Sequence, residues 1–387
     1  MPLEGMILDR NRMDLPLLIT TLLLVGIGAV MIYSASFVIA EEKFQGDSSF
    51  FLKRHLVRVA LGIGFLILFA NLDYRKMRKW SRSMIAIGII GLLILYIPGL
   101  GLEIRGATRT LKLWVFNVQP AEGIKIVMVL FLAHWLDKSQ HVIQKFIPGL
   151  LPGLIVIGMT CILIALQPDF GTAITLGLTS AAMLFIGRAR LTHLAGVAMF
   201  LAPFVGFKIY LSPHSWKRVM AYFERFFGDP AEKLVNVQGA DYQLQQSLIG
   251  LGTGGFFGTG LGQGKQKYLF LPDSYTDFVF SVIGEELGFI GALFVMGLFL
   301  VLAWRGIHIA KHAPDAYGYF LSSGLTTMIS LHVVLNIGVV TGLLPTTGLP
   351  MPFMSYGGSW LLFCMISIGI LLNISRGASR QQRLRYD

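Results

Sequence analysis

Long apolar stretches recur along almost the entire chain, and each is about long enough to cross a lipid bilayer. A spanning α-helix needs about 20 mostly apolar residues, because nothing in the hydrocarbon layer can pair with an exposed backbone N–H or C=O. Of the 387 residues, 54% are hydrophobic and only 14% are charged, whereas soluble domains carry about 25% charged residues. The sequence therefore predicts an all-α, polytopic membrane protein.

We predict about ten transmembrane helices, at residues 14–37, 56–72, 83–99, 120–136, 147–167, 170–187, 193–211, 277–304, 319–342 and 358–375. They are expected to form one transmembrane domain over 1–387. A short segment, 1–13, precedes the first span, a long loop, 212–276, joins spans seven and eight, and 376–387 is a tail. The first apolar core, 15–32, exceeds the 7–15 residues of a signal-peptide core, so it is predicted to be a retained span.

Lys and Arg are unevenly divided between the two sides of the predicted bundle. An even number of spans places both termini on one side. That side receives 17 Lys and Arg residues, and the other side receives 7 outside the long loop. Basic loops are retained in the cytoplasm, so both termini are expected to be cytoplasmic. The net charge of +11 then reflects topology and contact with anionic membrane lipids, not nucleic acid.

Two segments on the opposite, outer side are rich in glycine or proline. Residues 250–264 contain eight glycines and a G-x-G-x-x-G pattern, but no strand–helix–strand unit surrounds it, which argues against a dinucleotide site. A flexible or re-entrant loop and a loop that admits a bulky ligand both remain open. Residues 345–358, which include Ser355, cannot form a regular helix. Irregular backbone near membrane depth requires a protein-lined cavity.

Three carboxylates mark the eighth span. Asp277 stands where the long loop meets the span, and it fits either a helix cap or a general base at the membrane surface. Glu285 and Glu286 lie two turns deeper. A charge inside a span is costly and is usually paired, so at least one of them is expected to meet a cation or a polar cavity.

Other charged residues begin the fourth and sixth spans. Glu122 and Lys125 are three residues apart and share a helix face, which fits either a local ion pair or contacts across the bundle. Asp169 fits a helix cap. Arg109, in the 100–119 loop, could bind phosphate or anchor the chain at the interface. His332 is interpreted as a packed polar group, since no Cys, His and carboxylate cluster has the spacing of a zinc site.

These motifs together resemble the SEDS family (shape, elongation, division and sporulation proteins; FtsW, RodA and SpoVE). The residues that carry the resemblance are GATR at 106–109, QPAE at 119–122 with Lys125, QPDFGT at 167–172, LPDSYTDF at 271–278, GEELG at 284–288 and the segment 345–358. The division subfamily, FtsW, is favoured by YSAS at 33–36, FLKR at 51–54, QQSL at 245–248 and QK at 266–267. Thr110, Ala121, Tyr275 and Trp360 depart from the family pattern.

The resemblance implies a peptidoglycan glycosyltransferase that polymerises lipid II into a nascent β-1,4-linked glycan chain at the outer face of the bacterial cytoplasmic membrane. It implies a catalytic role for Asp277. Candidate substrate-binding residues are Arg109, Glu122, Lys125, Asp169, Glu285 and Ser355. No organic cofactor is expected. A divalent cation, Mg²⁺ or Mn²⁺, is compatible with a pyrophosphate leaving group, and its ligands are unknown.

The implied partners are a class B penicillin-binding protein, which is a transpeptidase, and other components of the division machinery. An elongation polymerase with the same activity is an alternative to a division enzyme. A flippase for lipid-linked precursor is a second alternative, and a noncatalytic division scaffold is a third. Outer-face clustering of the motifs favours an enzyme, because a flippase needs polar groups along its whole path.

Overall fold

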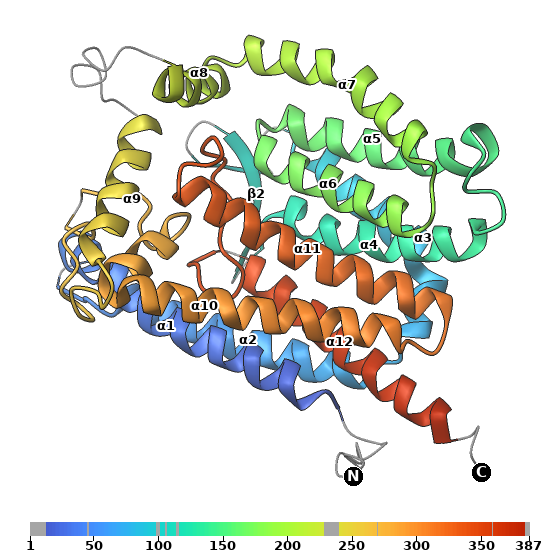
Figure 1. Cartoon of the computed structure of the whole chain (residues 1–387), viewed down its shortest axis with the longest axis horizontal. Helices are drawn as coiled ribbons and strands as arrows, with labels where there is room; N and C mark the ends of the chain where they lie inside the picture. The colour runs from blue at the N-terminus through green and yellow to red at the C-terminus, as the bar shows by residue number, and fades with distance from the viewer. Residues whose placement is uncertain are drawn as a thin grey trace, which may run out of the picture.

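Helices form at all ten places where spans were predicted (Figure 1). The computed structural model describes residues 13–44, 46–97, 101–104, 107–113, 116–227, 240–268, 270–357 and 359–383. The helices at the predicted spans are α1 (Leu15–Lys43), α2 (Phe50–Asn71), α3 (Tyr74–Ile94), α4 (Pro120–Ser139), α5 (Leu151–Leu166), α6 (Phe170–Ile186), α7 (Leu191–Leu211), α10 (Val279–Lys311), α11 (Ala316–Val340) and α12 (Trp360–Arg383). A π-helical turn, η1 (Phe146–Leu150), leads into α5.

The length and apolar character of these helices confirm a polytopic membrane protein. Within the described residues, six helices are long and apolar enough to span a membrane by themselves: α1, η1 with α5, α7, α10, α11 and α12. Helices α2 and α3 meet the same standard as a pair bent by 110°. Helix α6 is apolar but has only 17 residues, and α4 carries charged residues near both of its ends.

The basic segment at 73–82, which we expected to be a loop, is instead the start of α3. Asp73 caps this helix, because its side chain accepts a hydrogen bond from the backbone N–H of Arg75 at 2.9 Å. The cations of this segment therefore project from a helix, and their spacing along the chain fixes which of them share a face.

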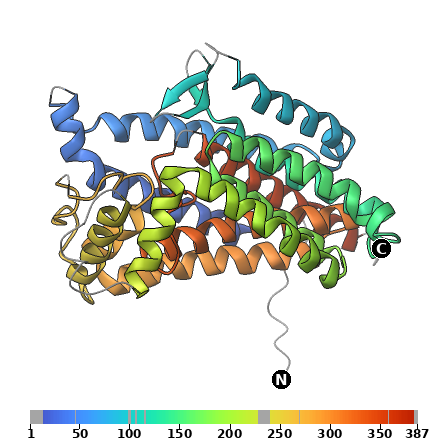
Figure 2. The same cartoon turned by 90° about the horizontal axis from the view of Figure 1, so that it is seen from above.

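The predicted loops contain secondary structure that apolar periodicity did not reveal. A three-stranded antiparallel sheet occupies the 100–119 loop, with β2 (Ala107–Leu113) between β1 (Gly101–Ile104) and β3 (Phe116–Val118). The long loop contains the amphipathic helix α8 (Pro213–Phe227) and a further helix, α9 (Ala240–Gly254). Figure 2 shows the sheet and α3 at the margin of the bundle.

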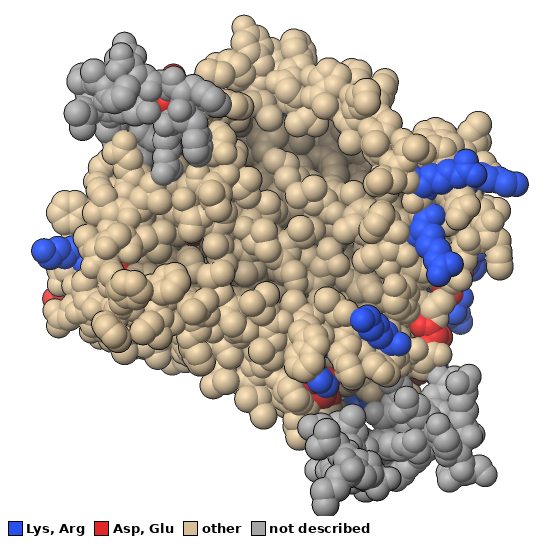
Figure 3. All heavy atoms as spheres, viewed as in Figure 1, with Lys and Arg blue, Asp and Glu red and all other residues tan. Residues whose placement is uncertain are grey.

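The core lies among α1, α4, α10, α11 and α12, which supply most of its fully buried apolar side chains. In contrast, none of the residues of α7, all of which are described, is buried. An apolar helix without buried residues is suited to contact with lipid. Figure 3 shows an uncharged band across this face of the molecule, with the visible Lys and Arg side chains gathered mainly at one end.

We call that end, where the basic residues gather, the basal end. Helices α1, α3 and α11 begin there, and α2, α4 and α10 end there. Polar contacts join these helix ends. Arg305 of α10 forms an ion pair with Asp14 before α1, at 2.6 Å. Asn373 of α12 donates to the carbonyl of Ala70 in α2, at 2.9 Å. The sheet and the 345–358 segment lie at the opposite, outer end.

Helix α10 is interrupted at Gly288, where φ is 70° and ψ is −171°. A β-carbon at this position would lie 2.2 Å from the backbone nitrogen of Gly258, so only glycine permits both the conformation and the close approach. The backbone N–H of Phe289 donates to Gly255 O at 2.9 Å. The glycine-rich segment is therefore docked on the interruption, and it pairs backbone groups that the helix leaves free.

Candidate active site

Asp277 lies in a turn that leads into α10 at the outer end. The N-cap residue of α10 is Phe278, so Asp277 precedes the cap position that one interpretation of the sequence gave it. The side chain is half-buried. Its Oδ2 atom lies 3.4 Å from the point where Gly348 would carry a β-carbon. The carboxylate therefore faces the irregular 345–358 segment, and the missing side chain at Gly348 leaves space beside it.

Asn336 of α11 holds the two sides of this site together. Its Nδ2 atom donates to the carbonyl of Asp277 at 2.8 Å and to the carbonyl of Leu349 at 2.7 Å. Both protons of one amide thus join the start of α10 to the segment that follows α11. Because Asn336 is buried, water cannot easily replace these bonds, and the amide fixes the backbone that carries Asp277.

The 345–358 segment has no regular helix in its described residues, as its prolines and glycines predicted. Ser355 is buried, and its Oγ accepts a hydrogen bond from the backbone N–H of Met351 at 2.7 Å. The N–H of Tyr356 donates to the carbonyl of Tyr275 at 2.8 Å. Ser355 therefore stabilises the segment's own turn, and Tyr356 ties that turn to the residues just before Asp277.

Glu122 and Asp169 belong to one polar network at the outer ends of α4 and α6. Ser359 donates a short hydrogen bond to Glu122 and also accepts the backbone N–H of Gln119 at 3.1 Å. The side-chain amide of Gln119 donates to Asp169 at 2.9 Å. Asp169 in turn caps α6 by accepting the N–H of Thr172 at 3.2 Å, as the helix-cap interpretation predicted.

Lys125 reaches across the bundle, in agreement with the second of the two interpretations. Its Nζ lies 2.9 Å from His332 Nε2 on α11 and 3.6 Å from the centre of the Trp360 ring. A lysine ammonium can only donate, so Nε2 accepts and the proton of the ring is on Nδ1, which faces the carbonyl of Met328 at 3.0 Å. His332 is a packed polar group, as expected.

Helix α11 connects this cation to the carboxylate of the site. His332 and Asn336 are four residues apart, which is about 6 Å along an α-helix. One of them contacts Lys125, and the other holds Asp277. Trp360, a departure from the family pattern, is fully buried and stacks on His332 with ring centres 4.3 Å apart. The tryptophan therefore covers both the lysine and the histidine.

Arg109 of β2 is engaged with backbone carbonyls. Its Nε atom donates to Gln167 O at 3.0 Å, and Nη2 makes a short contact with Pro168 O. Both carbonyls belong to the turn between α5 and α6, which ends at Asp169. Arg109 thus joins the sheet to this turn, and its side chain lies close to the network of Asp169.

Glu285 and Glu286 are both buried, and both hold the segment that follows α9. Glu285 Oε1 accepts the backbone N–H of Lys265 at 2.6 Å. Glu286 forms an ion pair with Lys267 at 2.7 Å, and Ser34 of α1 donates to the same carboxylate at 2.7 Å. The expectation that one glutamate meets a cation is confirmed. Glu285 itself lies among loop amides.

Two functional candidates were missed from the sequence. Lys267 is the fully buried partner of Glu286, and its pairing depends on contact between residues that no local pattern joins. Arg218 of α8 donates from Nη1 to the carbonyl of Thr346 at 3.2 Å. The basic, amphipathic character of 213–227 is a signal that could have drawn attention to Arg218. It brings a cation to the segment that borders Asp277.

The described residues contain no group of three or more His, Cys, Asp or Glu side chains that could hold a metal ion. Mg²⁺ is commonly held by one or two carboxylates together with substrate phosphates and water. The part of the chain described here thus provides no preformed metal cage, and a cation at Asp277 would depend on phosphate oxygens from a substrate.

Comparison with known proteins decides the family. The sequence matches the FtsW/RodA/SpoVE family, described as cell cycle proteins, over residues 15–380. The chain belongs to this family. Stage V sporulation protein E of Bacillus subtilis is 41% identical over 368 residues, which cover 95% of this chain and 98% of that protein. A Trichlorobacter lovleyi protein named probable peptidoglycan glycosyltransferase FtsW is 41% identical over 364 residues, covering 94% and 93%.

Solved structures support the FtsW/RodA/SpoVE fold over nearly the same length. A chain from a structure described as the coordination of polymerization and crosslinking by a peptidoglycan synthase complex matches with a TM-score of 0.75 and 25% identity, covering 95% of this chain and 98% of that one. The rod shape determining protein RodA of Thermus thermophilus matches with a TM-score of 0.67 and 25% identity, covering 94% and 97%.

Proposed function

We propose that this FtsW/RodA/SpoVE protein is a peptidoglycan glycosyltransferase that polymerises lipid II into β-1,4-linked glycan strands, for septal wall synthesis in cell division. The observation that carries the proposal is the setting of Asp277. A half-buried carboxylate faces Gly348 across an irregular segment, and Asn336 holds its backbone in place. The names of the relatives supply the reaction class, and this setting supplies a base at the outer end.

Asp277 acts as the general base in the proposed reaction. Its carboxylate removes the proton from the 4-hydroxyl of the acceptor's N-acetylglucosamine. That oxygen then bonds to the anomeric carbon of the donor chain's N-acetylmuramic acid. The bond from this carbon to the lipid pyrophosphate breaks, and the pyrophosphate leaves with the electron pair. Attack from the opposite face inverts the centre and gives the β-linkage. One base suffices, since pyrophosphate needs no protonating acid.

Positive charge near the site would stabilise the departing pyrophosphate, and such electrostatic stabilisation is commonly a large part of catalysis. Arg218 is a cation that contacts the segment beside Asp277, through the carbonyl of Thr346. Lys125 connects to the site through His332 and α11. We assign substrate contact to Arg218 and to the Glu122, Asp169 and Arg109 network, and a positioning role through His332 to Lys125, which Trp360 covers. Glu285 and Ser355 act as positioning residues, because both accept backbone N–H groups.

The remaining parts of the proposal concern location and partners. The distribution of Lys and Arg supports cytoplasmic termini in a bacterial cytoplasmic membrane, with Asp277 on the outer side. Lipid II and the growing glycan chain would meet there, since the substrate is part lipid and part sugar. A class B penicillin-binding protein is the proposed transpeptidase partner, together with divisome components. The likeness to a chain of a peptidoglycan synthase complex supports such a partner.

The test is polymerisation of purified lipid II by the full chain with its cognate transpeptidase, comparing Asp277→Asn with the parent. Asp47→Asn is the matched control, because Asp47 is an outer-end carboxylate that pairs with Lys53 away from this segment. We expect glycan product to be lost with Asp277→Asn and kept with the control, while both proteins remain folded. Undiminished product from Asp277→Asn would refute the assignment. Lipid transport without polymer would favour the flippase alternative.

A further inference from the structure

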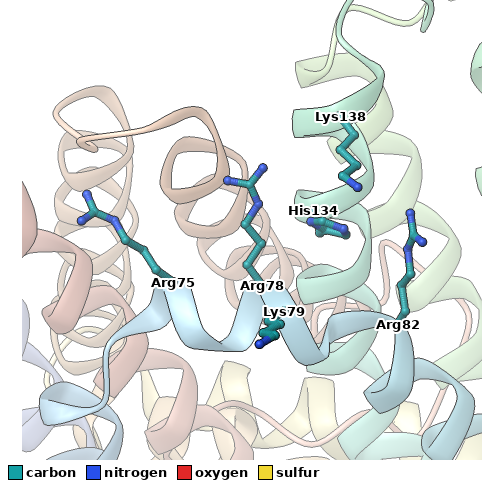
Figure 4. A pocket seen from close by; sticks show the side chains of 6 residues that line it. All are labelled: Arg75, Arg78, Lys79, Arg82, His134 and Lys138. Carbon is teal, nitrogen blue, oxygen red and sulfur yellow. The ribbon is translucent and has the colours of Figure 1, made fainter.

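A basic pocket of about 380 Å³ opens at the basal end, opposite the candidate active site. Helix α3 contributes Arg75, Arg78, Lys79 and Arg82, and α4 contributes His134 and Lys138. Figure 4 shows His134 and Lys138 between the side chains of Arg78 and Arg82. Arg78, Lys79 and Arg82 lie three, four and seven positions after Arg75, so the four residues share one face of the helix.

Part of this positive charge is neutralised by neighbouring carboxylates. Arg75 pairs with Asp315 at 3.0 Å, and Arg78 pairs with Asp137 at 2.5 Å. Lys79, Arg82 and Lys138 have no ion pair within the described part of the chain. The Nδ1 atom of His134 is buried and lacks a hydrogen-bond partner there. The pocket therefore presents three uncompensated cations and an unused ring nitrogen, which together fit an anion that accepts several hydrogen bonds.

The surroundings of the pocket indicate an anion attached to a lipid. Trp80, beside Lys79, is 62% exposed, and exposed indoles are enriched where a membrane meets water. Ile90 and Leu93 follow on the side of α3 that carries Arg82, about two and three turns further along, and both are exposed. Acyl chains could lie along this apolar surface while the headgroup occupies the pocket. A soluble phosphate would make no contact with this apolar surface.

We propose that the α3–α4 pocket binds the phosphodiester headgroup of an anionic phospholipid in the bilayer. Arg82 and Lys138 contact the phosphate, Arg78 holds one side of the pocket, and His134 Nδ1 takes part in the hydrogen bonding. Basic pockets between transmembrane helices on the cytoplasmic side are suited to such headgroups. The bound lipid would fix the basal half of α3, which lies at the margin of the bundle (Figure 2).

The test measures binding of dioleoyl phosphatidylglycerol to the full chain reconstituted in phosphatidylcholine nanodiscs. Brominated lipids report binding by quenching the fluorescence of Trp80. The quenching measured with Trp80→Phe is subtracted as background. The double variant Arg82→Gln, Lys138→Gln should weaken the preference for phosphatidylglycerol by roughly 30-fold, because each side chain contacts the bound phosphate and each contact contributes several-fold. The single variant Lys79→Gln should weaken it by roughly fivefold, because Lys79 is one of the cations that line the pocket.

The matched control is Arg190→Gln, Lys311→Gln, which removes the same charge at the basal end but outside the pocket. An unchanged preference in this control, with intact folding in all variants, supports the proposal. An equal loss in control and pocket variants would overturn it, since general charge attraction would then explain the binding. Displacement by an equal concentration of inorganic phosphate, or stronger capture of a polyprenyl pyrophosphate, would also overturn it by identifying another ligand.

Discussion

Replacement of Asn336 by leucine tests whether the amide of α11 positions the catalytic carboxylate. Leucine has a similar size and is apolar, so it fills the space but cannot donate to Asp277 O and Leu349 O, which Asn336 contacts at 2.8 and 2.7 Å. Loss of two hydrogen bonds costs about 2 kcal/mol of stability, and up to about 4 kcal/mol if both carbonyls stay unpaired.

A catalytic effect should accompany this loss of stability and be measurable separately from it. The carboxylate is attached to the backbone that Asn336 holds, and a displacement of about 1 Å at a catalytic group can reduce a rate roughly 100-fold. We expect kcat for lipid II polymerisation to fall by about 10- to 100-fold, with little change in KM, when activity is measured well below the unfolding temperature. That division between kcat and KM is the signature of a positioning residue.

Asn373→Leu is the matched control for this experiment. Asn373 also makes two backbone hydrogen bonds, donating to Ala70 O at 2.9 Å and accepting from Tyr74 N at 3.1 Å, but at the basal end. It should lower the unfolding temperature to a similar extent and leave kcat unchanged. Equal kcat values for the two variants, after correction for the folded fraction, would refute a positioning role for Asn336.

Three further predictions concern stability, each measured by thermal or chemical unfolding. Lys267→Met should destabilise the protein by about 3–5 kcal/mol, because it leaves Glu286 charged and buried. Adding Glu286→Leu should restore much of the lost stability. A double variant no more stable than the single one would contradict this. Gly288→Ala should destabilise the protein by more than about 1 kcal/mol, since the added carbon would lie 2.2 Å from the backbone nitrogen of Gly258. It should also expose the glycine-rich loop to hydrogen exchange, and unchanged exchange rates would disprove this prediction. Burial acts to raise the pKa of Asp315, but hydrogen bonds from Gly318, Tyr74 and Arg75 outweigh it and lower that pKa. Its contribution is therefore complete above the unfolded-state pKa of about 3.9 and is lost as pH falls through the lower folded-state value, so parent and Asp315→Asn should differ in stability at pH 7 and converge in acid.

The apolar segments of the chain were predictable because the bilayer imposes a length and a composition on each span. All ten predicted spans became helices. The boundaries were less predictable where polar residues continue a helix beyond the membrane. Helix α3 thus starts at Tyr74 and includes the basic run, because capping by Asp73 and helical propensity do not depend on hydrophobicity. The sheet in the 100–119 loop and helices α8 and α9 were not predicted, because these segments lack the long apolar runs that mark a membrane span.

Candidate residues were found from motifs, but the role of each depended on its neighbours. Spacing could place Glu122 and Lys125 on one helix face. It could not show that Glu122 meets Ser359 while Lys125 meets His332 and Trp360, because those residues come from α11, from the start of α12 and from the position just before it. Asn336, which belongs to none of the motifs, holds the backbone of Asp277.

The sequence by itself determined that the chain crosses a membrane many times and that its chemical motifs gather on one side, since both follow from local composition and from the charge of loops. Only the tertiary structure decided which of those motifs meet. Lys267 pairs with Glu286, Asn336 joins Asp277 to Leu349, and the glycine-rich loop closes on Gly288. Each of these contacts joins residues on separate elements, so it arises from packing and has no signature in the residues around it.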